Sequence, residues 1–307
     1  MREGPIPAPK AAAGGPNTAT APAPRRFGAQ SMVAPLREVL VKRPGPTFGA
    51  AFGERAHGFL RPVDLALAQR QHDAYCDLLA RLGVRVRELG EETFSPDLVY
   101  TFDPALVTDR GAILLRSGKP NRLGEEAALG RWFEAESIPI AGRIVAPGTA
   151  DGGDTFWLDR DTFCIGRSLR TNRAGAGQLA ALVGGGVHLF DVPYGEGPSV
   201  CLHLLSLISP VADDLAVVYL PLLPSGLHEL LREREVDLVA VPEEEWETLA
   251  TNVLAVRPGV AVMLAGNDRT ARALADRGCE VHTFDGSEVA INGGGGPTCL
   301  TRPILRG

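Results

Sequence analysis

A hairpin pattern that returns about every 50 residues is the feature that most limits what this chain can fold into. In each copy, two short apolar segments flank a polar turn, and the turns are centred on Arg110, Arg160, Asp213 and Pro258. A segment with the apolar spacing of a helix follows each hairpin. The hairpins cover residues 99–115, 155–165, 206–220 and 252–264, and the helices cover residues 124–136, 172–183, 225–234 and 268–277. The sequence therefore predicts one repeated unit, a hairpin followed by a helix.

The two ends of the chain supply what a fifth unit needs. Residues 32–43 alternate apolar and polar side chains and stop at Pro44, as a strand does, and residues 62–82 have helical spacing. A fifth unit closes only when residues 280–304 pair with the strand at residues 36–42. We therefore expect a closed ring of hairpins and helices, a single α/β domain in which loops from all units meet at one end of the axis.

Composition sets the domain limits and argues against two classes of partner. Residues 1–28 are rich in Ala, Pro and Gly without periodicity, so we predict a disordered segment followed by one domain over residues 29–307. Residues 45–58 are either an ordinary connection or a mobile flap. The net charge of −6, without a cluster of Lys or Arg, argues against binding of nucleic acid. No run of about 20 apolar residues indicates a membrane span.

The cysteines indicate reduced thiols. Cys76, Cys164, Cys201, Cys279 and Cys299 are odd in number, scattered, and without C-x-x-C spacing. This pattern favours a cytoplasmic protein over a disulfide framework and offers no zinc knuckle.

One of these thiols lies in an unusual loop near the end of the chain, residues 292–302, which reads Asn-Gly-Gly-Gly-Gly-Pro-Thr-Cys-Leu-Thr-Arg. Glycine runs permit positive φ and a close approach of the main chain to a ligand. The loop is therefore predicted to present the sulfur of Cys299 to a pocket. A catalytic thiol also needs a proton donor or base, and His203, which directly precedes the third hairpin, is the best placed of the six histidines.

Carboxylates take similar positions in consecutive units. Asp103 lies in the first complete hairpin, and Asp151 and Asp154 bracket a glycine pair just before the second. Acids around a thiol raise its pKa unless a cation joins them, so this set suits a cationic substrate. A guanidinium group offers a fork of donors to carboxylates and an electrophilic carbon to sulfur.

These residues carry a resemblance to a known family. The chain resembles the guanidino-group-modifying enzymes of the amidinotransferase and arginine deiminase superfamily, and within it dimethylarginine dimethylaminohydrolase, from about residue 31 to the end. The matching motifs are Phe102-Asp103-Pro104-Ala105, Gly118-Lys119-Pro120-Asn121-Arg122, Gly152-Gly153-Asp154, Arg170-Thr171-Asn172, His203-Leu204 and the terminal Gly-Gly-Pro-Thr-Cys299.

The resemblance implies a fold and a mechanism. The fold would be a pseudosymmetric five-bladed α/β propeller, or pentein. Cys299 would attack the guanidinium carbon, and His203 would protonate the departing amine and then activate water against the S-alkylthiouronium intermediate. Asp151 would complete the catalytic set, without a metal or an organic cofactor.

The resemblance also implies a substrate-binding set. Asp103 would hold the guanidinium group, with Phe102 and Asp154 beside it. Arg122 and Arg170 resemble the arginines that bind the substrate's carboxylate.

Two departures from the family pattern bear on specificity. Asp151 stands where the family usually has Glu, one methylene longer. Leu205 stands where arginine deiminases usually have Asp, and the loss of that carboxylate favours an N-substituted arginine over arginine itself.

The sequence thus indicates a cysteine hydrolase that converts an Nω-substituted, methylated arginine to citrulline and an amine. Amidino transfer to an amine and a ligand-binding homologue without turnover are the alternatives. The expected partner is a small guanidine, and a homodimer remains open.

Overall fold

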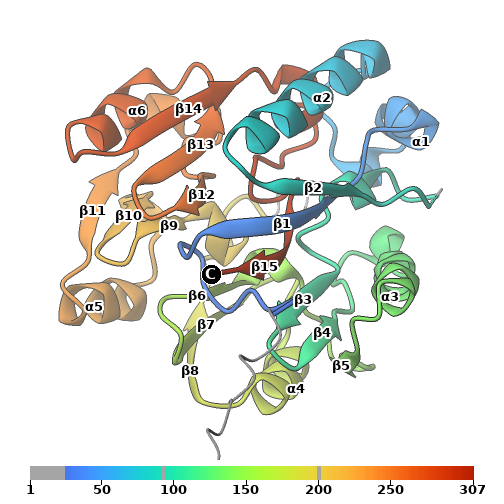
Figure 1. The fold of residues 1–307 in the computed structure, drawn as a ribbon, viewed down its shortest axis with the longest axis horizontal. Helices are drawn as coiled ribbons and strands as arrows, with labels where there is room; N and C mark the ends of the chain where they lie inside the picture. The colour runs from blue at the N-terminus through green and yellow to red at the C-terminus, as the bar shows by residue number, and fades with distance from the viewer. Residues whose placement is uncertain (1–24, 92–93, 199–201) are drawn as a thin grey trace, which may run out of the picture.

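The protein is a ring of five small sheets with helices on the outside (Figure 1). The computed structural model describes residues 25–91, 94–198 and 202–307. Over these residues each sheet has three strands, in the orders β15-β1-β2, β3-β4-β5, β6-β7-β8, β11-β10-β9 and β12-β13-β14. The strands are β1 Leu36–Val41, β2 Arg85–Glu88, β3 Ala105–Thr108, β4 Gly111–Leu114, β5 Ile140–Arg143, β6 Thr155–Trp157, β7 Thr162–Arg167, β8 Gly186–Asp191, β9 Ile208–Ala212, β10 Leu215–Val218, β11 Asp237–Ala240, β12 Leu254–Arg257, β13 Val260–Leu264, β14 Glu280–Phe284 and β15 Arg302–Arg306.

Each blade is a hairpin, a helix and a third strand. The helices are α1 Pro46–Ala50, α2 Leu65–Arg81, α3 Glu125–Ala135, α4 Arg173–Val183, α5 Ser225–Glu233 and α6 Asp268–Ala275. Single 3-10 turns and one π turn connect them, at Ala51–Gly53, Arg55–His57, Pro96–Val99, Pro120–Arg122, Gly152–Asp154, Leu204–Ser206, Leu220–Leu222, Glu243–Glu245 and Ser287–Ile291. The four predicted hairpins and the helices behind them are confirmed, and Asn172 caps α4 as expected, its side chain accepting from the amide of Gly175 at 2.8 Å.

The predicted repeated unit lacks the third strand that each blade contains. It follows the helix and pairs parallel with the second hairpin strand, as in β4 with β5 and β7 with β8. A parallel pairing needs a crossover, and the helix provides it. The repeated unit is therefore a hairpin, a helix and a strand rather than a hairpin and a helix.

The two ends of the chain close the ring as predicted, although the pairing of residues 280–304 needs correction. β15 pairs antiparallel with β1, and β2 pairs parallel with β1 on its other side. β14 does not join them, because it pairs parallel with β13 in the blade β12-β13-β14. The reason is its place after α6, which returns the chain to the sheet that it has just left.

The predicted disordered segment falls mostly outside the described residues, which begin at Arg25. Gly28 is already part of the fold: its amide donates to the carbonyl of Ile304 at 2.8 Å, and its carbonyl accepts from the amide of Arg306 at 2.9 Å. The described part of this segment therefore lies against β15.

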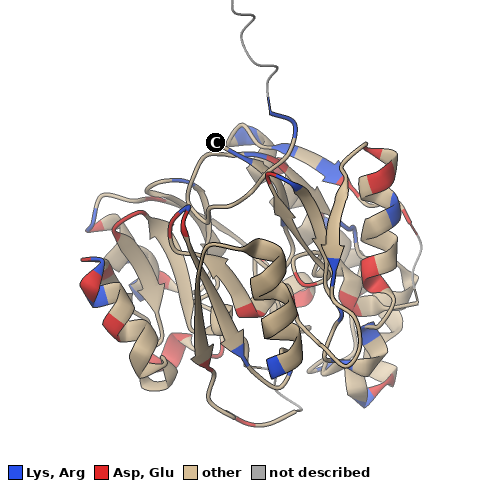
Figure 2. Cartoon of the chain, turned by 90° about the horizontal axis from the view of Figure 1, so that it is seen from below, with Lys and Arg blue, Asp and Glu red and all other residues tan. Residues whose placement is uncertain are grey.

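Each helix buries one face against its own sheet. In α2, for example, Ala68, Tyr75 and Leu79 are fully buried, so the burial of apolar area, worth about 25 cal/mol per Å², holds the helix in place. Figure 2 shows Lys and Arg interspersed with Asp and Glu over the molecule. Among the described residues, no helix is both long and apolar enough to cross a membrane.

Candidate active site

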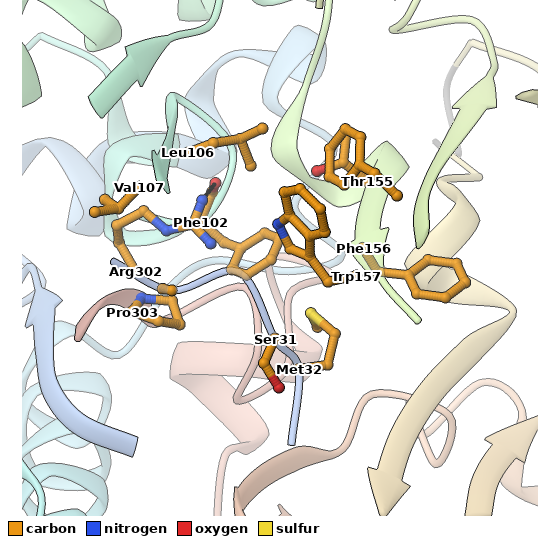
Figure 3. A pocket seen from close by; sticks show the side chains of 12 residues that line it. Ser31, Met32, Phe102, Leu106, Val107, Thr155, Phe156, Trp157, Arg302 and Pro303 are labelled. Atoms are coloured by element: carbon orange, nitrogen blue, oxygen red, sulfur yellow. Dashed lines mark hydrogen bonds between the residues drawn. The ribbon is translucent and has the colours of Figure 1, made fainter. Parts of the chain in front are cut away.

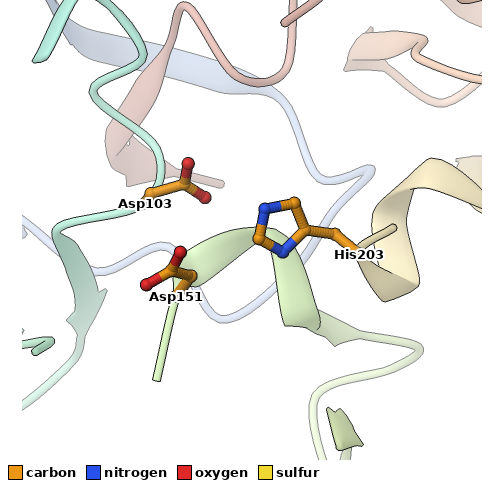
Figure 4. Close-up of side chains that lie close together, drawn as sticks. All are labelled: Asp103, Asp151 and His203. Atoms are coloured by element: carbon orange, nitrogen blue, oxygen red, sulfur yellow. The ribbon is translucent and has the colours of Figure 1, made fainter. Parts of the chain in front are cut away.

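Three of the predicted residues meet in one place. Asp103 follows the 3-10 turn Pro96–Val99, Asp151 precedes the turn Gly152–Asp154, and His203 precedes the turn Leu204–Ser206. One carboxylate oxygen of each aspartate and one ring nitrogen of His203 lie within 4.8 Å of one another. Figure 4 shows the carboxylate of Asp103 pointing toward the imidazole ring, with Asp151 beside them. Matching loops of the first three hairpin units therefore converge, as the ring geometry predicted.

The glycine loop brings the thiol of Cys299 beside this group. The amide of Phe102 donates to the carbonyl of Cys299 at 3.1 Å, so the backbone of Cys299 lies next to the segment that carries Asp103. The thiol is close enough to Asp103 and His203 for their charges to act on its pKa. Burial and the negative charge of Asp103 raise the pKa of Cys299 to about 11. The free thiol is therefore protonated at neutral pH, and a bound cation would favour the thiolate.

Asn252 positions the thiol, a role that was not predicted. Its Nδ2 lies 3.2 Å from the Sγ of Cys299, and its Oδ1 accepts from the amide of Thr298 at 2.9 Å. A Cβ at Gly296 would lie 2.6 Å from the Cγ of Asn252, so glycine is required for this close approach. The signal available was the position of Asn252 at the entrance of the fourth hairpin, which matches His203 at the third.

Asp103 is fixed by a buried ion pair. Its Oδ1 accepts from the amide of Gly153 at 2.8 Å, and its Oδ2 accepts from Nη1 of Arg122 at 2.5 Å. Burial alone would raise the pKa of Asp103, but Arg122, His203 and the Gly153 amide outweigh it and lower that pKa. Asp103 is therefore a negative charge of fixed orientation beside the thiol.

Arg122 is therefore not free to bind a substrate's carboxylate, the role that the resemblance implied. It is 5% exposed, and besides Asp103 its guanidinium donates to Oε2 of Glu125 at 2.8 and 2.9 Å and to the carbonyls of Asp97 and Tyr100. The sequence could not show that Glu125, three residues further along, would form an ion pair with Arg122.

Asp151 is held less completely. Its Oδ1 accepts from the amide of Gly118 at 3.1 Å, whereas its Oδ2 is buried and has no hydrogen-bond partner. Burial and the charge of Asp103 raise the pKa of Asp151. Asp151 belongs to the group with Asp103 and His203, where a cationic substrate would supply the missing donors.

Asp154 supports the histidine rather than facing a substrate. It is fully buried, its Oδ1 accepts from the amide of Leu204 at 3.0 Å, and its Oδ2 accepts from the hydroxyls of Ser168 and Thr171. The same Oδ2 lies 3.4 Å from Nδ1 of His203. This carboxylate can therefore orient the imidazole ring and stabilise its charged form.

Phe102 lies away from the group. Its backbone is shared with the site, but its ring packs against the guanidinium of Arg302, whose Cζ is 3.9 Å from the ring centroid. Phe102 and Asp103 are neighbours in sequence whose side chains serve different parts of the molecule. This packing argues against a direct contact of the Phe102 ring with substrate.

Arg170 stays near the site. It is half-buried, it directly precedes Thr171, which contacts Asp154, and its charge contributes to lowering the pKa of Lys119, a shift caused first by burial. Nζ of Lys119 donates to Oδ2 of Asp97 at 2.6 Å and to the carbonyl of His57 at 3.0 Å. Lys119, Asp97 and His57 form a second polar group, which the sequence analysis did not predict. The resemblance assigned none of these three residues a catalytic role.

The donor set of Asp103, Asp151 and His203 has the composition of a site for a divalent cation. Its surroundings fit a metal poorly, because Arg122 already places a full positive charge on one oxygen of Asp103. The arrangement suits an organic cation that shares the carboxylates through hydrogen bonds.

Comparison with known proteins agrees with this geometry. The sequence model described as arginine deiminase matches residues 203–306. The N(G),N(G)-dimethylarginine dimethylaminohydrolase of Streptomyces coelicolor is 32% identical over 253 residues, which cover 80% of this chain and 89% of that protein. The chain belongs to the guanidino-group-modifying enzymes.

Solved structures of these enzymes have the same fold. DDAH from Pseudomonas aeruginosa, complexed with citrulline, has a TM-score of 0.73 and 25% sequence identity, with 88% of this chain and 100% of that chain covered. An amidinotransferase of the saxitoxin biosynthetic pathway from Microseira wollei has a TM-score of 0.74 and 18% identity over 92% of this chain and 97% of that chain, and this likeness concerns the fold alone. The predicted five-bladed propeller is confirmed. The protein is a DDAH-like member of the superfamily.

Proposed function

We propose that the protein is a cysteine hydrolase that converts an Nω-methylated arginine to citrulline and a methylated amine. The observation that carries this proposal is the meeting of Asp103, Asp151 and His203 within 4.8 Å beside the glycine-presented thiol of Cys299. Two carboxylates, an imidazole and a thiol are the groups that hold a guanidinium cation, attack its carbon and protonate its leaving amine.

The charge of the substrate completes the site. The guanidinium donates to Asp103 and to the unpartnered Oδ2 of Asp151, and its positive charge lowers the pKa of Cys299 from about 11 toward neutrality. The thiol proton passes to His203. Substrate binding therefore activates the nucleophile, which stays neutral when the site is empty.

The reaction then balances in two steps. The thiolate of Cys299 bonds to the guanidinium carbon, the C–N bond to the methylated nitrogen breaks, and His203 returns the proton to the departing amine. Water, deprotonated by His203, adds to the same carbon of the S-alkylthiouronium intermediate, and the C–S bond breaks to give citrulline and the thiol. Asp154 holds the imidazole for both proton transfers through the 3.4 Å contact with Nδ1.

Selectivity for a substituted guanidine rests on what surrounds the histidine. Leu205 is 4% exposed and packs in an apolar cluster with Phe156 and Ile208, so no carboxylate follows His203 at that position. One nitrogen of the guanidinium therefore lacks a charged acceptor there, which favours a nitrogen that carries methyl groups. Arg170, on the loop next to Asp154, is the cation that we assign to the substrate's carboxylate.

A product assay with an acid-quench arm tests the proposal. The protein is incubated with Nω-methylated arginines and with arginine, and citrulline is measured. We expect citrulline from the methylated substrates and, after acid quench, a covalent adduct on Cys299 by mass spectrometry. The Cys299→Ser variant should lose both signals while keeping its unfolding midpoint.

Two outcomes would contradict the hydrolase. Transfer of the amidino group to an added amine, without citrulline, would make the protein an amidinotransferase. Binding of the substrate without adduct or product would make it a ligand-binding homologue.

A further inference from the structure

A buried arginine that forms no ion pair packs against the ring of Phe102. Arg302 is 4% exposed, and among the described residues no carboxylate lies within ion-pair distance of it. Its Nη1 donates to the carbonyls of Phe102 and Ala105, and the Phe102 ring covers one face of the guanidinium. A buried cation with only carbonyls and a ring around it is costly, because these groups replace little of its hydration.

One edge of this guanidinium is unused. Nε is buried without a hydrogen-bond partner, and Nη2, which lies on the same edge, makes no hydrogen bond to the described residues. The Nε and Nη2 edge is the fork with which arginine binds anions through two parallel N–H groups. The Nε and Nη2 edge therefore has the geometry of an anion cradle.

A cavity lies next to this arginine. It has a volume of about 20 Å³ and is lined by Arg302 and Phe102 together with Ser31, Met32 and Trp157 (Figure 3). Since about 10–15 Å³ on this measure holds one water, the cavity has room for a single small species and excludes an amino acid. The hydroxyl of Ser31 accepts from the amides of Val33 and Ala34, so its own hydrogen remains free to donate.

We propose that this cavity is a binding site for a small monovalent anion, of halide or formate size, which is the counter-ion of Arg302. The anion accepts from Nε and Nη2, with Ser31 as a further donor and apolar walls that exclude larger ions. Because Phe102 links Arg302 to the carbonyl of Cys299 through its backbone, the occupied cavity also steadies the segment that carries Asp103.

Thermal unfolding at constant ionic strength tests the site. Sodium chloride is titrated against sodium gluconate, whose anion is too large for the cavity. Chloride should raise the unfolding midpoint saturably, by about 2–4 °C at ten times its Kd. Formate in place of chloride shows whether an oxyanion is accepted as well, and a rise with either anion supports the site.

Two variants separate this site from general salt effects. Arg302→Met should abolish the saturable rise. Arg306→Met, on the same strand, removes a buried arginine whose Nη1 and Nη2 both bond to carbonyls, and should retain the rise. Persistence of the rise in Arg302→Met would overturn the proposal.

Crystals of the natural chain in bromide give a second measurement that does not depend on a variant. An anomalous peak beside the guanidinium of Arg302 is expected. Equal unfolding midpoints in chloride and gluconate, with no bromide peak in the cavity, would mean that the cavity holds only water and would refute the anion site.

Discussion

At the scale of single residues, Asp151 has the least favourable position in the site. It is 1% exposed, its Oδ2 has no hydrogen-bond partner, and burial together with Asp103 raises its pKa. Two buried carboxylates this close repel each other unless a cation lies between them. The free enzyme therefore stores an unfavourable charge that substrate binding relieves, a common origin of a conflict between stability and activity.

Asp151→Asn should make the protein more stable and less active. The amide removes the repulsion with Asp103 and keeps an oxygen for the amide of Gly118. We expect the free energy of unfolding at neutral pH to rise by about 1 kcal/mol and kcat to fall about 100-fold or more. Denaturant unfolding and the citrulline assay measure the two effects.

A matched comparison is Asp154→Asn, because Asp154 has hydrogen-bond donors on both oxygens. This change should lower stability as well as activity. A drop in stability for both variants would show that Asp151 is not under electrostatic strain.

His72 couples folding to acid pH. It is 2% exposed in α2, and burial lowers its pKa to about 4 from 6.5. Because its folded pKa lies below its unfolded pKa, the unfolded chain binds the proton more tightly between these values. Stability from this residue is complete above about pH 6.5 and is lost as the pH falls toward 4.

His72→Phe should therefore flatten the acid limb of the stability profile. The natural chain is expected to lose about 3 kcal/mol more than the variant between pH 7 and pH 4. Urea unfolding at several pH values gives this difference. His228→Gln, at an exposed position of α5, is the control and should follow the natural chain; parallel profiles for all three proteins would rule out His72 as the group responsible.

At the scale of elements, the hairpins and helices that have a periodic apolar pattern were predicted from the sequence. The hairpins carry two apolar segments around a turn, and the four helices carry an apolar stripe, so both were found. The third strands left no such signal: β2, for example, is four residues long with exposed ends, Arg85 and Glu88. They form because the preceding helix returns the chain to its own sheet.

The site was predictable to the extent that it follows from the ring. Equivalent loops of a propeller converge, which brought Asp103, Asp151 and His203 together from three units. Side-chain direction within a loop was not predictable, because it depends on partners far along the chain. Phe102 turns to Arg302 for this reason.

Leu60 and Arg61, which follow the candidate flap at residues 45–58, are tied to the glycine loop by one side chain. Asn292 is fully buried, its Oδ1 accepts from the amides of Leu60 and Arg61 at 3.1 and 3.0 Å, and its Nδ2 donates to the carbonyl of Arg61 and to Glu288. These hydrogen bonds couple the loop that presents Cys299 to residues 60–61.

Asn292→Ala should loosen both segments. The amide of Arg61 loses its acceptor, the amide of Leu60 keeps only the backbone carbonyl of Asn292, and Glu288 loses a donor. We therefore expect a loss of about 2–4 kcal/mol in the free energy of unfolding. Hydrogen exchange should accelerate at Leu60 and Arg61 and along residues 292–299.

Asn267→Ala provides the control for this prediction. Asn267 is 1% exposed and donates to the carbonyls of Thr248 and Leu264 in the fourth blade. A similar loss of stability is expected, with exchange at residues 60–61 unchanged. Equal acceleration there in both variants would show that Asn292 does not specifically anchor residues 60–61.

At the scale of the whole molecule, the ends of the chain form one blade. β1 and β2 come from the beginning of the domain and β15 from its end, so the ring has no complete first or last unit. In an open repeat array each unit contacts only its neighbours, and loss of a terminal unit is tolerated. Here the blade that closes the ring needs both ends, and Cys299 lies just before β15.

A circular permutant should therefore fold where a short truncation fails. The guanidinium of Arg25 contacts the carbonyl of Arg306, so a short linker can join Gly307 to Arg25, and new ends can be opened in the exposed turn between Asp213 and Asp214. All pairings of the ring are kept, and we expect an unfolding midpoint close to that of the natural chain and full citrulline formation.

Deletion of residues 302–307 removes β15 together with the buried Ile304, leaves β1 with an open edge, and should abolish cooperative unfolding. Calorimetry of the two proteins distinguishes a ring from an open array, because an open array would lose only part of its unfolding enthalpy on truncation and keep the rest as a cooperative transition.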